Sequence, residues 1–319
     1  MILGLIAVFL TAFIVTLIIT PLIIKKEIDA GIIGKDMHKP IKRKIANMGG
    51  LSVAIGVTTA IILAIGLKTF FHTSIDLTII MAGLITILLI NFMGIFDDLF
   101  EIRQVVKALL PLFAAIPLIA ISVGTTVMTF PIIGSVDFGI IYLIALVPLG
   151  LAVASNLTNM LAGFNGNEVG MGIVIFLTTS YIALMNNEIE ALFISLAMVG
   201  ALIAFLKFNW YPADAFPGDV LNLMIGGALA VVVIIGNFES IGFVLMIPYI
   251  LDWIIKAYNK FPKSFAVYNP KDKKLYTPKG KIRGLADLIL KVSGGMKETH
   301  LTLTLIGIEI IFALIAILI

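Results

Sequence analysis

The sequence predicts an all-α integral membrane protein that forms one transmembrane domain over residues 1–319. Its residues are 60% hydrophobic and 13% charged, whereas a soluble domain is about 25% charged. Ten apolar stretches are each about 20 residues long, which suits helices that cross a bilayer and satisfy their own backbone hydrogen bonds. These stretches are roughly 2–24, 48–67, 77–95, 105–123, 139–157, 168–185, 189–206, 219–236, 240–258 and 298–319.

Two of the connections between these stretches carry further predicted structure. Residues 125–138 are rich in β-branched side chains around a Pro/Gly turn, which predicts a small hairpin on the outer side. Residues 259–297 form a long polar loop on the cytoplasmic side. Within this loop, 282–292 place apolar residues at helical spacing, so we expect an amphipathic helix that lies at the membrane interface.

The lysine and arginine residues lie almost entirely on one side of the predicted bundle. Of these 22 residues, 21 fall on odd-numbered connections, mainly in 25–47 and 256–297, and Lys68 falls on an even one. The positive-inside rule therefore predicts that the odd connections are cytoplasmic and that both termini lie outside. In a prokaryote this would be a multi-pass protein of the cell membrane.

Polar residues interrupt the apolar helices on the predicted cytoplasmic side, in 97–107, 156–168 and 209–219. The chain has no cysteine, which excludes disulfides, thiolate metal sites and a cysteine nucleophile. The chemistry is therefore expected in these three polar segments. Asp252 and Glu309, near or inside the last two predicted helices, could pair within the bundle and are assigned no role.

Asp97 and Asp98 are adjacent carboxylates at the end of the third apolar stretch. Two adjacent carboxylates are costly to keep charged unless a cation or a proton is close by. Lys107 follows at the start of the next helix and could supply the cation. A helix-end charge pair with a snorkelling lysine explains the pair alone equally well. Charges at the membrane border nevertheless point to function by default.

Asn156 and Asn159 are spaced i,i+3 and therefore face the same way at the end of the fifth predicted helix. The turn that follows is punctuated by glycines, which let backbone amides approach a ligand closely. It carries Asn165, Gly166, Asn167 and Glu168. Taken alone, this segment is better explained as a helix cap and turn, which asparagine favours.

Asp219 ends an FPGD sequence at the start of the eighth predicted helix. A helix N-cap is the simple interpretation, and a Mg²⁺ ligand is the alternative, because hard cations prefer carboxylate and amide oxygens. Asp214 could equally be a solvated loop residue. Phe216 could stack on a nucleobase, although core packing explains its position as well.

The three polar segments and the two basic loops share one membrane face, and this combination is more informative than any one of them. Carboxylates, amides and lysines together suit an anionic substrate with Mg²⁺, and hence phosphoryl transfer at the membrane surface. A transporter would place polar residues near the bilayer midplane, where these helices are almost uniformly apolar. The basic loops alone could also bind anionic lipid head groups.

The chain resembles the polyprenyl-phosphate N-acetylhexosamine-1-phosphate transferase superfamily, glycosyltransferase family 4. The resemblance covers roughly residues 30–307 and rests on motifs that occur in one order: GKDMHK (34–39), the acidic pair with Lys107, NxxNxLAGxNGxExG (156–170) and FNWYPxxxFxGD (208–219). The sequences LAGFNGNEVG, FNWYP and 285–306 are similar to the archaeal and eukaryotic UDP-N-acetylglucosamine–dolichyl-phosphate branch.

The resemblance implies catalytic roles for Asp97, Asp98, Lys107 and Asp219 and a metal-binding role for Asn159. Asp219 and Asn159 would hold Mg²⁺, or alternatively Mn²⁺, against the diphosphate of the sugar donor. Asp97 and Asp98 would orient or deprotonate the lipid phosphate, and Lys107 would neutralise phosphate charge.

The resemblance also implies a set of substrate-binding residues. Uracil would contact Asn165, Phe216 and the backbone near Asp36 and Met37, while Asn156 would shape the diphosphate site. The wider set adds Gly166 and Glu168.

The last cytoplasmic loop departs from the family pattern, because it has neither the bacterial histidine-rich motif nor the eukaryotic arginine-histidine-arginine cluster. We expect its own cations to contact the diphosphate and the sugar in their place: Lys271, Lys273, Lys274 and Arg283. Pro217 also stands where the family pattern leads us to expect a small or aliphatic residue.

The expected reaction is transfer of GlcNAc-1-phosphate from UDP-GlcNAc to a polyprenyl (dolichyl) phosphate with release of UMP, the first step of lipid-linked oligosaccharide assembly for N-glycosylation. Alternatives are another UDP-N-acetylhexosamine donor, a role in cell-envelope glycans, a transporter of nucleotide sugars or lipid-linked sugars, and a non-catalytic scaffold. The expected partners are the two substrates and membrane lipids, without nucleic acid, and a homodimer stays open.

Overall fold

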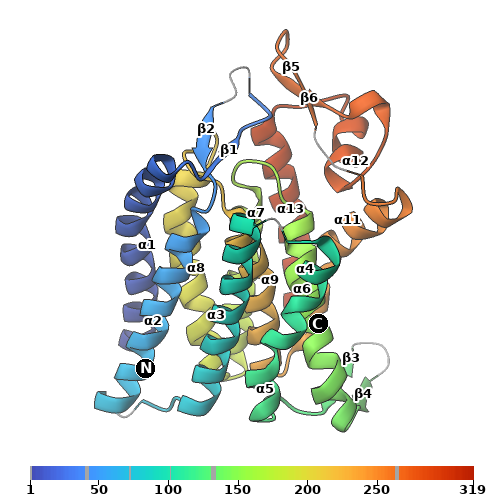
Figure 1. Ribbon diagram of the computed structural model, residues 1–319. Helices are drawn as coiled ribbons and strands as arrows, with labels where there is room; N and C mark the ends of the chain where they lie inside the picture. The colour runs from blue at the N-terminus through green and yellow to red at the C-terminus, as the bar shows by residue number, and fades with distance from the viewer. Residues whose placement is uncertain (1, 40–42, 72, 101, 131–133, 263–265) are drawn as a thin grey trace.

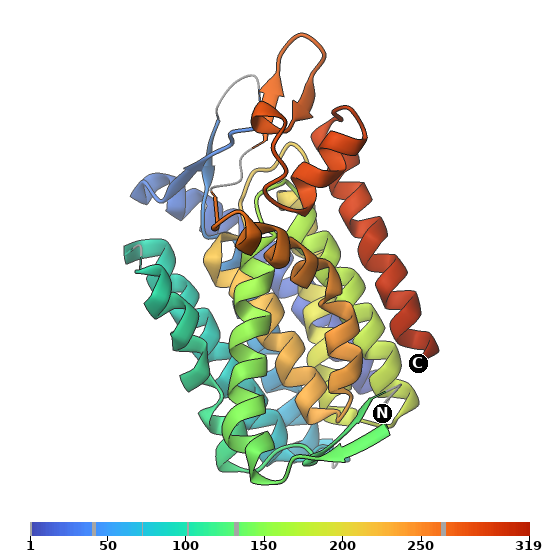
Figure 2. The ribbon, with the colours of Figure 1, turned by 90° about the vertical axis from the view of Figure 1, so that its right-hand side faces the viewer.

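The computed structural model describes residues 2–39, 43–71, 73–100, 102–130, 134–262 and 266–319. Long helices run side by side, and short hairpins lie at both ends of the bundle (Figure 1). One end carries β1, β2, β5, β6 and α12, and we call it the site end. The opposite end carries β3 and β4, and Figure 2 shows the last helix running towards it from the site end.

Eight helices in the described part of the chain are long and apolar enough to cross a membrane, or nine if one bent pair counts as a single span. The predicted all-α, multi-pass membrane fold is therefore confirmed. The eight are α1 (Ile2–Ala30), α2 (Gly50–Phe71), α3 (Leu77–Phe100), η1 (Tyr142–Leu146) continued by α6 (Val147–Met160), α7 (Asn167–Met185), α8 (Ile189–Asn209), α9 (Gly218–Ile235) and α13 (Glu298–Leu318).

The remaining two predicted stretches are broken helices. The ninth is split into α10 (Glu239–Leu245) and α11 (Ile247–Tyr258), which meet at an angle of 56°. The fourth, predicted over 105–123, consists of the shorter helices α4 (Gln104–Ala114) and α5 (Ile116–Ala120).

Prolines stand at the start of the helices that follow these breaks. Pro248 lies at the beginning of α11, Pro117 at the beginning of α5, and Pro148 at the change from η1 to α6. Proline has no backbone N–H and its ring collides with the preceding turn, so a helix tends to bend or restart there. The ten apolar stretches were predicted from hydropathy, and hydropathy does not indicate where a proline bends or restarts a helix.

Three small hairpins connect the helices. The hairpin predicted within 125–138 is confirmed as β3 (Val127–Phe130) paired with β4 (Gly134–Asp137), and its tip at 131–133 lies outside the described residues. The pairs β1 (Ile33–Lys35) with β2 (Lys44–Ala46), and β5 (Val267–Asn269) with β6 (Lys274–Tyr276), were not predicted.

The predicted amphipathic helix in the polar loop is present as α12. It spans Leu285–Val292, three residues shorter at its start than the predicted 282–292, and it follows a single turn of 3₁₀ helix at Pro278–Gly280. Asp252 of α11 accepts a hydrogen bond from the backbone N–H of Leu285 at 2.8 Å. Asp252, which has no role assigned from its sequence position, therefore joins α11 to the start of α12.

Helix α9 lies at the centre of the bundle, and 89% of its apolar window is buried. It passes very close to α3 at Gly94, where an added Cβ would collide with the Cα atom of Val220. This close crossing brings the acidic end of α3 next to the first turn of α9.

We expect Gly94→Ala to destabilise the protein, because the added methyl group would force α3 away from α9 at a cost of about 1–3 kcal/mol. Thermal unfolding of the purified protein in detergent measures this as a lower Tm. Gly66→Ala is the matched control, since Gly66 is also helical and a Cβ there meets nothing within 4 Å. An equal effect of the two substitutions on Tm would contradict the close-crossing argument.

Candidate active site

The ammonium group of Lys107 lies between two carboxylates that come from different helices. Its Nζ atom is 2.6 Å from Oδ2 of Asp219 and also forms an ion pair with Asp97. The Lys107 side chain is 12% exposed and that of Asp97 is 7% exposed, so water shields these charges poorly. The structure thus brings together three of the predicted catalytic residues, from α3, α4 and α9.

Asp98, the fourth predicted catalytic residue, caps the start of α9. Its Oδ2 atom accepts a hydrogen bond from the backbone N–H of Val220 at 3.1 Å. A carboxylate at a helix N-terminus is favoured by unpaired N–H groups and by the helix dipole. Asp219 is not the N-cap of its own helix, since Pro217 holds that position. The capping hydrogen bond comes from Asp98 of α3, and Asp219 contacts Lys107 instead.

The two asparagines of α6 have different partners. Oδ1 of Asn159 accepts a hydrogen bond from Nδ2 of Asn222 at 3.2 Å, and Asn222 lies one turn after Asp219 on α9. Nδ2 of Asn156 instead donates to the backbone oxygen of Ala108 at 3.3 Å. Asn159 thus lies beside the Asp219 helix, and Asn156 anchors the α4 segment that carries Lys107.

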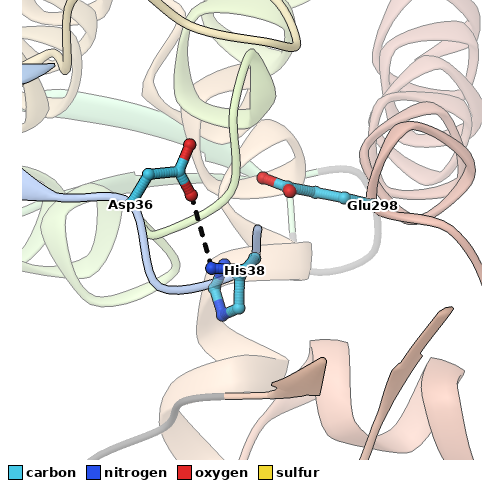
Figure 3. A group of neighbouring side chains, drawn as sticks. All are labelled: Asp36, His38 and Glu298. Carbon is cyan, nitrogen blue, oxygen red and sulfur yellow. Dashed lines mark hydrogen bonds between the residues drawn. The ribbon is translucent and has the colours of Figure 1, made fainter. Parts of the chain in front are cut away.

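A second polar cluster lies at the start of α13 and contains Asp36, Lys39, Asn165 and Glu298. Lys39 pairs with Asp36 at 3.2 Å and with Glu298, and Nδ2 of Asn165 donates to Asp36 at 3.2 Å. Each of the four residues is at most 8% exposed. Figure 3 shows Glu298 reaching from its helix towards Asp36.

Asp36, Glu298 and His38 have ligand atoms within 4.8 Å of one another, a spacing that could hold a metal ion. The Lys39 ammonium group already pairs with both carboxylates, so a cation of the protein itself lies between them. The ring of His38 stacks on Phe164 with centroids 5.0 Å apart. Its backbone N–H, and not its imidazole, donates to Asp36 at 3.3 Å (Figure 3).

The glycine-rich turn before α7 is held by buried hydrogen bonds. The N–H of Gly166 donates to Oδ1 of Asn209 at 3.1 Å, and the positive φ of 79° at Gly166 favours glycine. Glu168 accepts a hydrogen bond from the N–H of Gly163 within the same turn. Both residues were predicted to bind substrate, and in the structure both shape the turn that presents Asn165.

Phe216 is half-buried and lies against β1. A Cβ at Gly34 would be 2.9 Å from Cδ2 of Phe216, and the N–H of Phe216 donates to the backbone oxygen of Ala46 at 2.8 Å. The β1–β2 hairpin thus fixes the position of this aromatic ring. Met37, beyond the hairpin strand, is 41% exposed.

A cavity of about 300 Å³ lies beside the second polar cluster. Lys273 and Lys297 contribute to its wall together with His38, Tyr211, Tyr268 and Glu298. Among the cations predicted to bind substrate, the described wall includes Lys273 but not Lys271, Lys274 or Arg283. Nε of Arg283 is paired with Asp287 at 3.0 Å.

The remaining predicted polar residues have simple positions. Asp214 forms an exposed ion pair with Arg43 at 3.4 Å, as expected for a solvated loop residue. Pro217 precedes α9, and its backbone oxygen accepts the N–H of Gly50 at 3.0 Å. Glu309 is fully buried in α13, and neither of its carboxylate oxygens has a hydrogen-bond partner among the described residues.

A family model described as glycosyl transferase family 4 matches residues 80–237. A protein of Sulfolobus acidocaldarius, provisionally named UDP-N-acetylglucosamine–dolichyl-phosphate N-acetylglucosaminephosphotransferase, is 34% identical over 99% of this chain and 96% of its own length. The chain belongs to glycosyl transferase family 4. The predicted family resemblance is therefore confirmed.

Two further relatives indicate the range of this family. The UDP-N-acetylglucosamine–dolichyl-phosphate N-acetylglucosaminephosphotransferase of Dictyostelium discoideum is 27% identical over 87% of this chain and 78% of its own length. The phospho-N-acetylmuramoyl-pentapeptide-transferase of Halalkalibacterium halodurans is 30% identical over 72% of this chain and 74% of its own length. Membership of the family is thus compatible with more than one sugar donor.

Four residues of these clusters were not assigned as site residues from the sequence: His38, Lys39, Asn222 and Glu298. Asn222 could have been found, because it lies three residues after Asp219 and therefore on the same face of the helix. Glu298 carried no comparable signal, since its contacts to Asn165 and Lys39 span 133 and 259 residues of sequence.

The buried imidazole of His38 predicts a pH dependence of stability. Burial lowers its pKa from 6.5 to about 4, an effect that Asp36 opposes and Lys39 reinforces. As the pH falls from 6.5 towards 4, the unfolded chain takes up this proton first, so stability present above pH 6.5 is lost in that window. The loss amounts to about 3 kcal/mol at most.

We therefore expect His38→Phe, which keeps the stacking on Phe164, to flatten the dependence of Tm on pH between pH 7 and 4. Thermal unfolding in detergent across this range measures the slope. His300→Phe is the control, because His300 is exposed on α13. A wild-type slope in the His38 variant would show that another group causes the acid instability.

Proposed function

We propose that this protein transfers GlcNAc-1-phosphate from UDP-GlcNAc to a polyprenyl phosphate of the dolichyl type and releases UMP. The observation that carries the proposal is the burial of Lys107 between Asp97 and Asp219 in a chain of this family. Relatives named for this reaction are 34% and 27% identical to the chain. The product would enter lipid-linked oligosaccharide assembly for N-glycosylation.

The charges of the site favour a divalent cation. Three carboxylates, those of Asp97, Asp98 and Asp219, face one ammonium group, and both proposed substrates carry phosphates. Asp219 and Asn159 offer hard oxygen ligands, and Oδ1 of Asn222 is a buried acceptor without a partner among the described residues. These groups fit Mg²⁺, with Mn²⁺ as the alternative. When bound, the metal would stabilise negative charge on the diphosphate.

The proposed step forms one P–O bond and breaks another. An oxygen of the lipid phosphate attacks the β-phosphorus of UDP-GlcNAc in line, and the bond from that phosphorus to the bridging oxygen breaks, so UMP leaves with the electron pair. Lys107 would neutralise charge in the transition state, and positioning would supply much of the rate.

Direct attack suits the contacts of the acidic pair. One oxygen of Asp97 accepts the N–H of Ile102 at 2.9 Å and the other pairs with Lys107. Asp98 is engaged at the start of α9. Because both residues have structural partners, we favour an acceptor phosphate that attacks directly over an aspartyl-phosphate intermediate.

An apolar groove of about 330 Å³ could hold the prenyl chain. It is lined by residues of α6, α9, α10 and α11, and it extends along α6 through Gly150 and Val153 to Leu157. Leu157 lies between Asn156 and Asn159, so the groove approaches the polar end of α6. A lipid lying there would bring its phosphate towards the site from the membrane.

The donor would lie at the site end between the two polar clusters. Asn165 and Phe216 would contact the uracil with the backbone near Met37, and Lys273 is the loop cation that we assign to the donor phosphates or sugar. The concentration of lysine and arginine at this end supports a cytoplasmic position for the site, by the positive-inside rule.

The first test is UMP release by the purified protein with UDP-GlcNAc, dolichyl phosphate and Mg²⁺. We expect Asp219→Asn and EDTA each to reduce the rate by at least about 100-fold, because each removes electrostatic stabilisation from the reacting phosphates. Asp214→Asn is the matched control, because Asp214 is an exposed carboxylate in the segment that precedes α9.

The UMP-release measurement distinguishes the proposed reaction from its alternatives. UMP release that requires the lipid, the metal and Asp219 would establish the transferase. Release with another UDP-sugar in place of UDP-GlcNAc would change the donor and keep the reaction. No release across a panel of UDP-sugars and prenyl phosphates would overturn the proposed function.

The groove is tested with Gly150→Phe. A Cβ at Gly150 meets nothing within 4 Å, so the ring can enter the groove without displacing the backbone. We expect the KM for dolichyl phosphate to rise by about tenfold or more, with the KM for UDP-GlcNAc unchanged. Gly307→Phe is the control, a helical glycine with equally open surroundings outside the groove. Equal KM values for the lipid in both variants would remove the groove from the proposal.

A further inference from the structure

Four buried residues form a closed ring of hydrogen bonds and ion pairs at the site end. Asn165 donates through Nδ2 to Asp36 and through its backbone N–H to Oε1 of Glu298, at 3.2 and 2.9 Å. Lys39 closes the ring by pairing with both carboxylates. The ring joins the β1–β2 connection, the turn before α7 and the first turn of α13, three segments that are far apart in the sequence.

The ring fixes Asn165 at three points. Besides the two donated hydrogen bonds, its backbone oxygen accepts from Oγ1 of Thr302 at 3.1 Å. Glu298 and Thr302 lie one turn apart on α13, so one helix face holds both backbone groups of Asn165. The side-chain amide is then the part of Asn165 that remains to contact a ligand.

Asp36 decides which way that amide points. A carboxylate only accepts hydrogen bonds, so the NH₂ group of Asn165 must face Asp36 and the amide cannot turn over without losing this bond. Among the described residues, Oδ1 of Asn165 accepts no hydrogen bond, and the second N–H of the amide donates none. The locked amide therefore presents one acceptor and one donor in a fixed order.

Uracil and cytosine differ in the order of these groups. Uracil has a donor at N3 and an acceptor at O4, which match a carbonyl and an N–H of the amide. Cytosine has an acceptor at N3 and a donor at N4, which match the same amide only after it has turned over.

We propose that Asp36, anchored by Lys39 and Glu298, is a specificity-determining residue that locks the Asn165 amide in the orientation that reads uracil and rejects cytosine. This inference rests on the proposed function, in which Asn165 contacts the base of a uridine nucleotide. It assigns Lys39 and Glu298 as positioning residues, which act through Asp36 and Asn165 without touching the substrate.

The ring itself explains why these charges are tolerated inside the protein. Asp36 and Glu298 are 3% and 4% exposed, and Lys39 is 8% exposed. The Lys39 ammonium also lies 4.1 Å from the centre of the Tyr211 ring, a favourable cation–π contact. Buried charges are stable only when they are paired and hydrogen-bonded, so the ring is expected to keep one geometry.

The test is calorimetric binding of UMP and CMP to the purified full-length protein in detergent. We expect wild-type protein to prefer UMP, and Asp36→Asn to reduce the UMP-to-CMP preference by about tenfold, because the substituted amide could accept from or donate to either orientation of the Asn165 amide. Asp214→Asn is the matched control, since Asp214 is an exposed carboxylate of a nearby loop and should leave the preference unchanged.

A second pair of variants keeps the test valid if Asp36→Asn does not fold. Glu298→Gln retains the shape of the side chain and weakens the anchor, so the preference should fall in the same direction but by less. Glu309→Gln is its control, because Glu309 is a buried carboxylate on the same helix without a hydrogen-bond partner among the described residues. Thermal unfolding of each variant separates a loss of folding from a change in base preference.

The outcomes distinguish this inference from the proposed function. If wild-type protein binds neither nucleotide and releases no UMP, the proposed function fails and the inference fails with it. If wild-type protein prefers UMP and the folded Asp36 or Glu298 variants keep the full preference, the amide lock is wrong while the transferase stands. A reduced preference in these variants, absent from their controls, supports the lock.

Discussion

The ion pairs of Lys107 with Asp97 and Asp219 hold three helices together where an apolar bundle meets its polar end. These side chains are mostly buried, so water shields their charges poorly. Their attraction is therefore stronger than it would be in solution. Removing one partner from such a buried group leaves an uncompensated charge, at a cost of about 3–5 kcal/mol. The pairs therefore fix the relative positions of α3, α4 and α9.

This arrangement depends on very close backbone contacts. Gly94 lets α3 touch the first turn of α9, and Gly218, with a positive φ of 69°, lies where a Cβ would be 2.6 Å from Oδ2 of Asp98. Asp98 then caps α9 across the helix boundary. The two glycines thus let the carboxylates of α3 and α9 come close to one another, and the ion pairs stabilise the helices in that position.

The second cluster follows the same physical rule with different groups. Lys39 pairs with Asp36 and Glu298, as Lys107 pairs with Asp97 and Asp219, and each lysine joins carboxylates from distant segments. One cluster suits phosphate chemistry, and the other holds the turn that presents Asn165. The β1–β2 hairpin takes part in this cluster through Asp36 and Lys39, which lie in the connection between its strands. The strands themselves contact Phe216.

The sequence by itself determined the membrane fold, the acidic pair, the asparagines of α6 and the family, because hydropathy and short motifs depend on local order along the chain. It did not predict the helix breaks at Pro117 and Pro248, although the prolines were visible. Only the tertiary structure decided that Asp98 caps α9, that Asn156 supports α4 and that Glu298 holds Asn165. These contacts join residues 48 to 133 positions apart, and such pairs are chosen by helix packing, which no local pattern encodes.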